Sequence, residues 1–532
     1  MTSERFDVVV IGGGINGVAI ARACARGGKR VLILEQNDFA SGTTSRSTRI
    51  IHGGLRYLEH GELGLVREAL RERERLRAEH SHLVRPLKFL LALGAGGNHS
   101  ALAVRAGLWL YATLGAGRPS AVDGELDRLE RLLDSAQRWS VFHYDDAQCE
   151  FPERLVAEWL CDALAHGADA RNHTRVLEVE TRDGRATGVR ARSLLDASEF
   201  RARADWIVNA SGPWVDRVCA AASVRTRSPL IGGVRGSHLV LRRFPGAPAS
   251  AVYSEAVDGR PFFLLPWNGQ LLAGATEVRD HADPGKTEPG AGEIEYLFAS
   301  LNRLFPGAHL SWNDVQATFA GVRPLPYAPG EKPSAISRRH FLHDHSDDGA
   351  AGMISVIGGK LTTAAAIARE CARKIGIDAP EPALAAAPSA QEIEAALGGW
   401  SRAVAQRAHI AEASARALAE WHGAGAAEIA HAAAMDERQR APLCEHSPHI
   451  VAEAVAAVRR ECASTLADIL LRRVPVALGA CWTDQCSRTA AARIGVVLGW
   501  SAARAARERD AFEEERAGFW KRAEAVALQQ RG

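Results

Sequence analysis

Three glycines near the N-terminus have the spacing at which a protein backbone binds phosphate. Gly12, Gly14 and Gly17 form a GxGxxG pattern directly after the apolar run at residues 8–11. In such a loop the first glycine permits a tight turn, the second lets the backbone approach a pyrophosphate, and the third lets helix and strand pack closely. The apolar run is typical of a strand buried on both faces of a parallel sheet. The pattern therefore predicts a strand, a phosphate-binding loop and a helix.

The residues after this loop complete a dinucleotide-binding unit. A helix is expected over residues 15–25 and a second apolar strand over residues 30–34, which ends at Glu35. The N-terminus of the helix offers free N–H groups and the positive end of its dipole to phosphates. Glu35 is placed to accept hydrogen bonds from a ribose diol. The order of strand, glycines, helix, strand and acid predicts dinucleotide binding rather than a plain glycine-rich turn.

Two later stretches have further features of a cofactor-binding backbone. Residues 353–363, MISVIGGKLTT, again have the pattern of a strand, a double glycine and a helix start. Residues 41–49, SGTTSRSTR, are rich in hydroxyl groups, and Gly53 and Gly54 follow them. Such a segment suits a backbone that wraps closely around a polar cofactor, and the alternative is a mobile polar loop. Its position after the nucleotide-binding strand leaves both interpretations open.

Composition and charge exclude several classes of protein. The chain has 532 residues, of which 47% are hydrophobic and 24% charged, as in a globular protein with more than one domain. The formal net charge of +2 argues against a nucleic-acid partner. The nine cysteines contain no CxxC pair, which favours reduced thiols over a disulfide frame or a zinc site. Cys481 and Cys486 form the closest pair and are interpreted as packing residues, so no metal site is predicted.

Neither a cleaved signal peptide nor a membrane-spanning helix is expected from the sequence. The first strand begins within the first six residues, and no apolar run reaches about 18 residues. Residues 83–118 form the most apolar extended region, in which a helix is expected over residues 102–114. That helix has two interpretations: a buried core helix, or a helix that lies on anionic lipid next to Arg105 and Arg118. We favour the buried helix.

The rest of the chain divides by composition. Several short strand candidates lie between residues 230 and 325, which predicts a β-rich lobe. A segment rich in Pro and Ala near residue 380 is typical of a linker. Ala-, Arg- and Glu-rich helical patterns follow it almost to the C-terminus, so residues 385–532 are expected to form a separate helical domain.

Taken together, these residues resemble the FAD-dependent glycerol-3-phosphate dehydrogenases, within the larger family of D-amino-acid-oxidase-like flavoproteins. The resemblance covers essentially the whole chain, and its motifs are IGGGINGVAIA at 11–21, IIHGGLRYLEHGE at 50–62, VNASGPWV at 208–215, RGSHLV at 235–240, AGVRPLP at 320–326 and IGGKLTT at 357–363. It implies an α/β fold in which a Rossmann-like FAD-binding domain is interleaved with a β-rich substrate domain, plus a C-terminal all-helical domain. The implied bounds are 1–380 for the oxidoreductase unit, with FAD-binding segments 1–80, 150–230 and 350–380 and a substrate lobe at 81–149 and 231–349, followed by 385–532.

The resemblance also implies an activity. It is the oxidation of sn-glycerol 3-phosphate to dihydroxyacetone phosphate, with electrons passed through FAD to the quinone pool. A cytoplasmic position, contact with the cytoplasmic face of the inner membrane and assembly as a homodimer are further expectations. One alternative is an FAD-dependent oxidase or dehydrogenase of an amine or a hydroxy acid on the same fold. Another is a flavin protein without turnover that assembles through its C-terminal helices.

The same resemblance implies the site residues. Arginine suits bidentate phosphate binding, and Arg56 and Arg323 match the family's phosphate and active-site arginines. His238 is the candidate general base, because an imidazole accepts a proton near neutral pH. Lys360 would lie at the edge of the flavin, where a cation stabilises charge on the reduced ring. Substrate contacts are expected from Arg56, Tyr57, His238, Thr276 and Arg323, and FAD contacts from Gly12, Gly14, Asn16, Gly17, Glu35, Ser45, Gly53, Gly54, Ala210, Gly212, Gly359, Lys360, Leu361 and Thr362.

Overall fold

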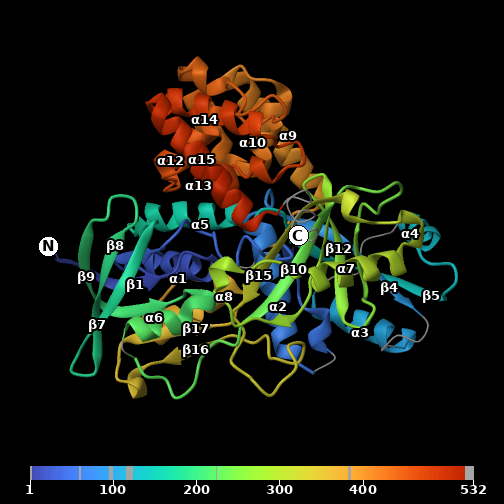
Figure 1. Cartoon of the computed structure of the whole chain (residues 1–532), viewed down its shortest axis with the longest axis horizontal. Helices are drawn as coiled ribbons and strands as arrows, with labels where there is room; N and C mark the ends of the chain where they lie inside the picture. Colours follow the sequence, from blue (N-terminus) through green and yellow to red (C-terminus); the bar gives the residue numbers. More distant parts are fainter. Residues whose placement is uncertain are drawn as a thin grey trace.

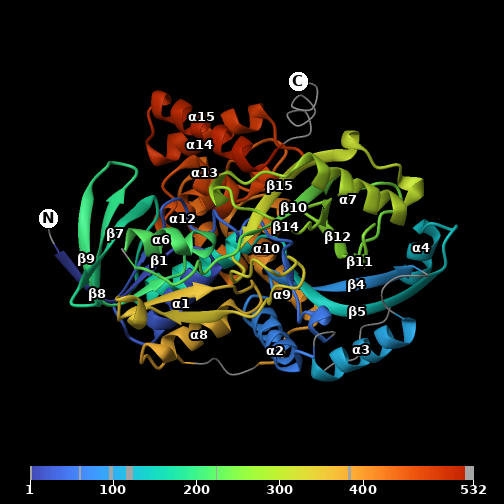
Figure 2. The same cartoon turned by 60° about the horizontal axis from the view of Figure 1, so that its bottom comes forward.

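Two β-sheets and a group of C-terminal helices make up the described part of the chain (Figure 1). The computed structural model describes residues 3–58, 61–94, 100–115, 124–222, 224–380 and 385–521. Part of the motif at 50–62, part of the apolar region at 83–118 and part of the linker near residue 380 therefore lie outside the described residues. The two sheets lie side by side, and the C-terminal helices cover one side of the molecule (Figures 1 and 2).

The first sheet has eight strands, and its central strands are parallel. Its order is β16-β17-β9-β1-β2-β6, with β7 and β8 attached through β9. Because β17, β9 and β1 run parallel, their carboxyl ends meet at one edge, where ligands bind in open α/β sheets. The strands are β1 (Ser3–Ile11), β2 (Val31–Leu34), β6 (Asp169–Arg171), β7 (Thr174–Arg182), β8 (Arg185–Ser193), β9 (Glu199–Asn209), β16 (Phe341–Asp344) and β17 (Met353–Ile357).

Helices pack against this sheet where its central strands are buried on both faces. Val8, Val9 and Val10 in β1 are fully buried, and so are all residues of β2. The helices α1 and α8 pack against each other, and α1 also packs against α5. The helices of this layer are α1 (Ile15–Arg26), α5 (Pro152–Ala165), α6 (Val215–Ala221) and α8 (Ala364–Lys374).

The second sheet has nine strands and is mostly antiparallel. Its order is β14-β10-β13-β12-β11-β4-β5-β3, and β15 pairs with β10. The strands are β3 (Ile50–Ile51), β4 (Val84–Gly94), β5 (Trp139–Cys149), β10 (Val234–Leu241), β11 (Ala251–Glu255), β12 (Pro261–Trp267), β13 (Gln270–Gly274), β14 (Val278–Arg279) and β15 (Val315–Arg323). The helices next to it are α2 (Leu63–Glu79), α3 (Ala101–Leu114), α4 (Glu125–Leu132) and α7 (Ala291–Leu304).

The α/β fold with an added helical domain is confirmed. The strands alternate between the two sheets along the chain, as an interleaved arrangement requires. Two short strands differ from the expected division: β3 pairs with β5 in the second sheet, and β16 pairs with β17 at the edge of the first. The expected bounds of the two interleaved domains stay a prediction.

The preferred interpretation of residues 102–114 as a buried core helix is wrong. The helix α3 forms, but Tyr111 is its only buried residue. The side chains of Leu102 and Trp109 are 79% and 69% exposed. The helix is apolar on more than the face that packs, so periodicity alone could not place it. No helix in the described ranges is both long enough and apolar enough to cross a membrane.

The C-terminal helices contact the first sheet through buried ion pairs. The Arg473 guanidinium donates to both carboxylate oxygens of Asp38 at 2.7 and 2.8 Å, and Arg472 also donates to Asp38. These two arginines end a π-helical turn, Ile469–Arg473, and all three side chains are buried. The helices of this group are α9 (Ala390–Ala408), α10 (Glu412–His422), α11 (Ala426–Met435), α12 (Val451–Arg460), α13 (Leu466–Asp468), α14 (Asp484–Leu498) and α15 (Ala502–Phe519).

Replacing Asp38 with Asn should destabilise the protein strongly, because the buried Arg473 loses its ion-pair partner and the buried Arg472 loses one of its three carboxylate partners. We expect the free energy of unfolding to fall by about 3 kcal/mol, measured by urea denaturation. Asp183→Asn is the matched control, because Asp183 and its partner Arg182 are exposed and such pairs contribute about 1 kcal/mol or less. Equal effects of the two substitutions would contradict a stabilising role for the buried pairs.

Candidate active site

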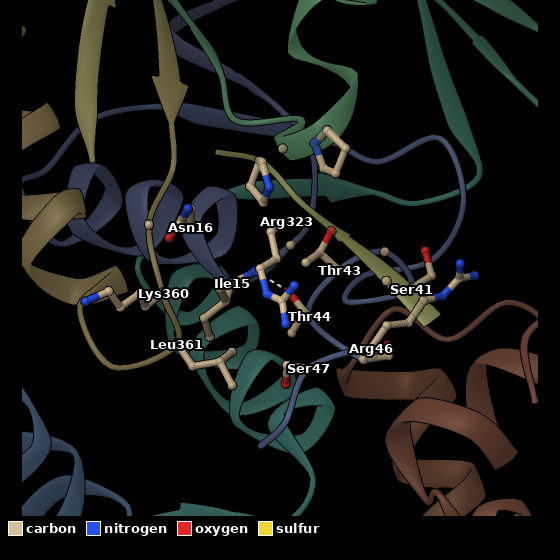
Figure 3. Close-up of a pocket in the computed structure, with 18 of the residues that line it drawn as sticks. Ile15, Asn16, Ser41, Thr43, Thr44, Arg46, Ser47, Arg323, Lys360 and Leu361 are labelled. Atoms are coloured by element: carbon tan, nitrogen blue, oxygen red, sulfur yellow. Dashed lines mark hydrogen bonds between the residues drawn. The ribbon is translucent and has the colours of Figure 1, made fainter. Parts of the chain in front are cut away.

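A cavity of about 810 Å³ lies between the carboxyl edge of the first sheet and the second sheet. The loops after β1, β9 and β17 line it, together with the hydroxyl-rich segment 41–49. Strands β10 and β15 of the second sheet contribute His238 and Arg323. Figure 3 shows Asn16 and Lys360 on one side of this cavity and Ser41 and Arg46 on the other. Segments far apart in the sequence thus share one site.

The first glycine loop has the geometry that a phosphate cradle requires. Gly12 has φ +106°, and a Cβ atom there would lie 2.7 Å from the Ala210 carbonyl oxygen. A Cβ at Gly17 would lie 1.9 Å from the Gly12 carbonyl oxygen, so this position must be glycine for α1 to pack. Gly14 meets only the Thr44 hydroxyl, at 3.3 Å, which leaves its backbone open to a ligand. The loop is therefore ordered by its glycines and open on the cavity side.

Glu35 closes this end of the cavity. Its carboxylate accepts hydrogen bonds from the Gly13 N–H at 2.7 Å and the Asn37 N–H at 2.8 Å. Burial raises the pKa of Glu35, and these two hydrogen bonds oppose the rise. The side chain is thus fixed at the cavity wall, at the position expected for a ribose-binding acid.

The two glycine loops are joined by a side-chain hydrogen bond. The Asn16 Nδ2 donates to the Gly358 carbonyl oxygen at 3.2 Å, although the two residues are 342 positions apart. A Cβ at Gly359 would lie 2.6 Å from the same amide nitrogen. Thr44 contributes to this arrangement, because its hydroxyl accepts the Ile15 N–H at 3.1 Å (Figure 3). These contacts keep the N-terminus of α1 and the segment 358–362 next to each other in the wall of the cavity.

The segment 52–54 is held by buried polar groups. The His52 N–H donates to the Thr362 hydroxyl at 3.1 Å, and the Gly53 N–H donates to the Tyr111 hydroxyl at 2.8 Å. Burial, followed by the nearby Lys360 charge, lowers the pKa of His52 to about 3, so its imidazole is neutral at physiological pH. His52 and Gly54 line the cavity.

Lys360 is a buried cation in the cavity wall. Its Nζ has no hydrogen-bond partner within the described residues and lies 3.8 Å from the centre of the Tyr57 ring. Burial, followed by the charge of Arg338, lowers the pKa of Lys360 to about 7. A buried ammonium group without a hydrogen-bond partner is suited to interact with a bound anion or with a group that becomes negative.

His238 lines the cavity from β10, the strand that pairs with β15. Its Nε2 lies 3.0 Å from the Thr48 hydroxyl, and its ring stacks on Phe319 with the centroids 4.7 Å apart. Burial, followed by the charges of Arg323 and Arg49, lowers the pKa of His238 to about 3. The imidazole is therefore neutral and able to accept a proton, and its orientation is set by Thr48 and Phe319.

A group of cations surrounds the end of the cavity near Tyr57. Arg323 donates to the Thr276 carbonyl oxygen at 3.1 Å, and burial followed by the Arg338 charge lowers the pKa of Arg323 to about 10. Arg338 pairs with Glu277, and Arg56 donates to the Ser334 carbonyl oxygen at 3.3 Å. All three arginines line the cavity. Three guanidinium groups and the carboxylate of Glu277 thus meet at this end, and this excess of positive charge is suited to bind an anion.

The structure places most of the predicted site residues on one cavity. Three differ. Gly17 packs α1 against β1, and Gly53 is fixed by Tyr111, so neither lines the cavity. The Thr276 hydroxyl donates to Glu293 and accepts the Ser237 N–H, and only the Thr276 carbonyl reaches a cavity residue, Arg323. The predicted residues that do line the cavity are Gly12, Gly14, Asn16, Glu35, Ser45, Gly54, Arg56, Tyr57, Ala210, Gly212, His238, Arg323, Gly359, Lys360, Leu361 and Thr362.

Several cavity residues were not singled out by the sequence. Arg338 has no motif around it, and its role follows only from its place beside Arg323 and Lys360. His52 lies inside a recognised motif but was not assigned. The C-terminal helices contribute Arg472, Glu515 and Phe519, which no local pattern connects to the cofactor segments. The segment 41–49 lines the cavity along its whole length, which favours its interpretation as a cofactor-binding loop.

A dinucleotide that carries a flavin fits this cavity. The glycine loop presents an open backbone to a pyrophosphate, and Glu35 lies where a ribose would. Six buried polar atoms in the lining have no hydrogen-bond partner among the residues that the structure describes: Asn16 Oδ1, Arg46 Nε, Arg49 Nε, His238 Nδ1, Glu277 Oε2 and Lys360 Nζ. Buried polar groups are almost always paired, so a polar ligand is the expected partner for this set.

Replacing Lys360 with Met should stabilise the protein without its cofactor at neutral pH. The pKa of Lys360 is about 7 in the folded chain and 10.5 in the unfolded chain. Between these two pH values the unfolded chain binds one proton more than the folded chain, so the free energy of unfolding of the wild type rises with pH. We expect the variant to be more stable by roughly 4 kcal/mol at pH 7 and the difference to shrink to about 1 kcal/mol by pH 10. Urea denaturation at both pH values measures this, with Lys374→Met as the control. A difference that does not change with pH would contradict the lowered pKa.

Comparisons with known proteins identify the family of this chain. Residues 7–373 match the family model described as FAD dependent oxidoreductase, and residues 372–505 match the model described as C-terminal domain of alpha-glycerophosphate oxidase. A glycerol-3-phosphate dehydrogenase from Synechocystis sp. is 38% identical over 508 residues, which is 90% of each chain. Glycerol-3-phosphate dehydrogenase 2 from Mycobacterium tuberculosis is 31% identical over 551 residues, covering 99% of this chain and 90% of that one.

A solved structure shares the fold over almost the whole length. The glycerol-3-phosphate dehydrogenase from Bacillus halodurans, complexed with FAD, superimposes with a TM-score of 0.76 at 24% identity, covering 98% of this chain and 96% of that one. This likeness confirms the arrangement of both sheets and of the C-terminal helices. The chain therefore belongs to the FAD-dependent oxidoreductase family, among the glycerol-3-phosphate dehydrogenases with an alpha-glycerophosphate oxidase C-terminal domain.

Proposed function

We propose that this protein oxidises sn-glycerol 3-phosphate to dihydroxyacetone phosphate with FAD and passes the electrons to a quinone. The observation that carries the proposal is the grouping of Arg323, Arg338 and Lys360 around one end of a cavity whose wall also holds the neutral His238. The relatives named glycerol-3-phosphate dehydrogenase support the same substrate.

The cavity arginines are suited to bind the phosphate group of the substrate. A guanidinium binds phosphate oxygens through two parallel hydrogen bonds, and Arg323 and Arg338 lie next to each other at the cavity wall. Arg56 enters the same end from the 3-10 turn Leu55–Leu58. A hydroxy acid would offer a carboxylate, for which one arginine suffices, and a simple amine would offer no anion, so the additional arginines favour a phosphate dianion.

The chemistry requires removal of a hydroxyl proton and a hydride from the same carbinol. Bound FAD supplies the hydride acceptor. We assign His238 Nδ1 as the proton acceptor, because the ring lines the cavity, this nitrogen has no partner among the described residues, and the Thr48 hydroxyl at Nε2 fixes the direction of the ring. The negative phosphate opposes the lowering of the His238 pKa and so strengthens it as a base. Lys360 Nζ provides a positive charge in a dry site, where it stabilises the negative charge that develops on transfer.

The proposed quinone partner requires access from a membrane. Helix α3 presents Leu102 and Trp109 to the surface, and Arg105 lies between them. We propose that this helix rests on the cytoplasmic face of the inner membrane. Assembly as a homodimer remains a prediction.

The acceptor is tested by following the reduction of a short-chain ubiquinone and the consumption of oxygen in parallel, with glycerol 3-phosphate as the donor. We expect quinone reduction to be faster than oxygen reduction under the same conditions. If oxygen is reduced and quinone is not, the protein is an oxidase and this part of the proposal is wrong.

Removing either cavity arginine should weaken phosphate recognition. For Arg323→Ala and Arg338→Ala we expect kcat/KM for glycerol 3-phosphate to fall about 30-fold or more, mainly through KM, because truncating a buried charged partner costs roughly 2–5 kcal/mol. The bound flavin, measured by its absorbance, should be retained. Arg339→Ala is the control, because Arg339 is exposed and adjacent. Normal KM values in both cavity variants would place the phosphate elsewhere.

Replacing His238 with Gln should slow catalysis without weakening binding. We expect kcat to fall by about 10²–10⁴, the usual contribution of a general base, with little change in KM. Anaerobic flavin reduction by glycerol 3-phosphate should slow by the same factor, while reduction by dithionite should not. A wild-type rate of flavin reduction in this variant would exclude His238 as the base.

A further inference from the structure

Three potential metal ligands meet in the C-terminal helical domain, far in sequence from the cofactor segments. The Sγ atoms of Cys444 and Cys486 and a ring nitrogen of His446 all lie within 4.8 Å of one another. The Cys486 Sγ lies 3.7 Å from the His446 Nδ1, although the residues are 40 positions apart. Both cysteines are buried, and His446 closes the group on the solvent side. None of these residues has a part in the oxidation described above.

The separations match those between ligands of a tetrahedral zinc ion. Zinc–sulfur and zinc–nitrogen bonds of about 2.3 and 2.0 Å place two tetrahedral ligand atoms about 3.6–3.8 Å apart. The Cys486–His446 distance of 3.7 Å is in this range, and the full group needs only small shifts to reach it. Two thiolates and an imidazole are also the ligand types that zinc prefers over magnesium or calcium.

A fourth ligand is available from Cys481. The Cys481 Sγ lies 4.0 Å from the His446 carbonyl oxygen, and the Cys486 Sγ lies 3.8 Å from the Cys481 carbonyl oxygen. The Cys481 side chain is exposed, so rotation about χ1 is not blocked by packing. With it the ligands are Cys444, His446, Cys481 and Cys486, a Cys₃His set of the kind found in structural zinc sites.

The backbone around these residues is held by hydrogen bonds of its own. The Ser447 N–H donates to the Cys444 carbonyl at 3.2 Å, and the Leu443 N–H donates to the His449 carbonyl at 2.8 Å, which fixes the loop 443–449. The Thr483 hydroxyl donates to the Cys486 Sγ at 3.3 Å, so it orients the sulfur atom that would bind the metal. Cys486 lies in the first turn of α14, where the helix dipole favours a thiolate.

We propose that Cys444, His446, Cys481 and Cys486 bind one zinc ion that fastens the loop 443–449 to the start of α14. The site is closed by protein ligands, so its role is structural and goes beyond the proposed oxidation. The ion would stabilise the junction next to Val476–Leu478, where Gln270 of the second sheet and Arg516 of α15 donate to Leu478 and Ala477. It would thereby hold the helical domain against the rest of the molecule.

The metal content of the full-length flavoprotein, purified without a metal-affinity step, tests this proposal. We expect about one zinc per chain by inductively coupled plasma mass spectrometry. Cys444→Ser combined with Cys486→Ser should lower bound zinc at least tenfold, and Cys161→Ser, a cysteine outside the group, should leave it unchanged. Zinc at the same level in the double variant and the wild type, or no zinc in either, would overturn the proposal.

A second measurement needs no substitution. Wild-type protein treated with a chelator and refilled with Co²⁺ should show the intense absorption of tetrahedral cobalt thiolate in the red, beyond the flavin bands, and should unfold at a higher temperature than the chelated protein. A Cys444–Cys486 disulfide in the purified protein, detected by mass spectrometry without reduction, would show that the pair is redox-linked and would overturn the zinc site. Absence of the cobalt bands after refilling would overturn it as well.

Discussion

The hydrogen bond from Asn16 to the Gly358 carbonyl joins the first and last strand units of the cofactor-binding sheet, and the site depends on it. Strands β1, β9 and β17 end at the same edge, so their loops can surround one ligand. Asn16 at the start of α1 then fixes the second glycine loop in place. Lys360 follows this loop directly, so the contact that holds the dinucleotide cradle also sets the position of the buried cation.

The second sheet adds the groups that distinguish this site from a simple dinucleotide fold. Strands β10 and β15 pair along their lengths, which brings His238 opposite Phe319 and sets Arg323 at the end of the pair. The neutral imidazole and the charged guanidinium are produced by the same burial, because burial disfavours the charged form of both and only arginine has a high enough pKa to remain charged. One environment thus yields a base and an anion-binding group.

Local sequence patterns predicted individual strands, helices and the glycine loop. Features that depend on contacts between distant segments could not be predicted from them. The glycine spacing and the apolar run before it were sufficient for β1, α1 and the cradle, because Gly12 and Gly17 are required by backbone geometry. The family motifs located His238, Arg323 and Lys360. Arg338, the contribution of Arg472 and Phe519, and the surface position of α3 depend on how distant segments pack, for which a single sequence has no periodic signal. The proximity of Cys444 and His446 to Cys486 also depends on the packing of distant segments, so the sequence did not predict it.

The most direct test of the proposed reaction is an anaerobic titration of the purified flavoprotein with glycerol 3-phosphate, followed by flavin absorbance. The account predicts that about one equivalent bleaches the flavin and yields dihydroxyacetone phosphate, while glycerol, which lacks the phosphate, has no effect at the same concentration. A flavin that stays oxidised with glycerol 3-phosphate, or that glycerol bleaches equally well, would contradict it.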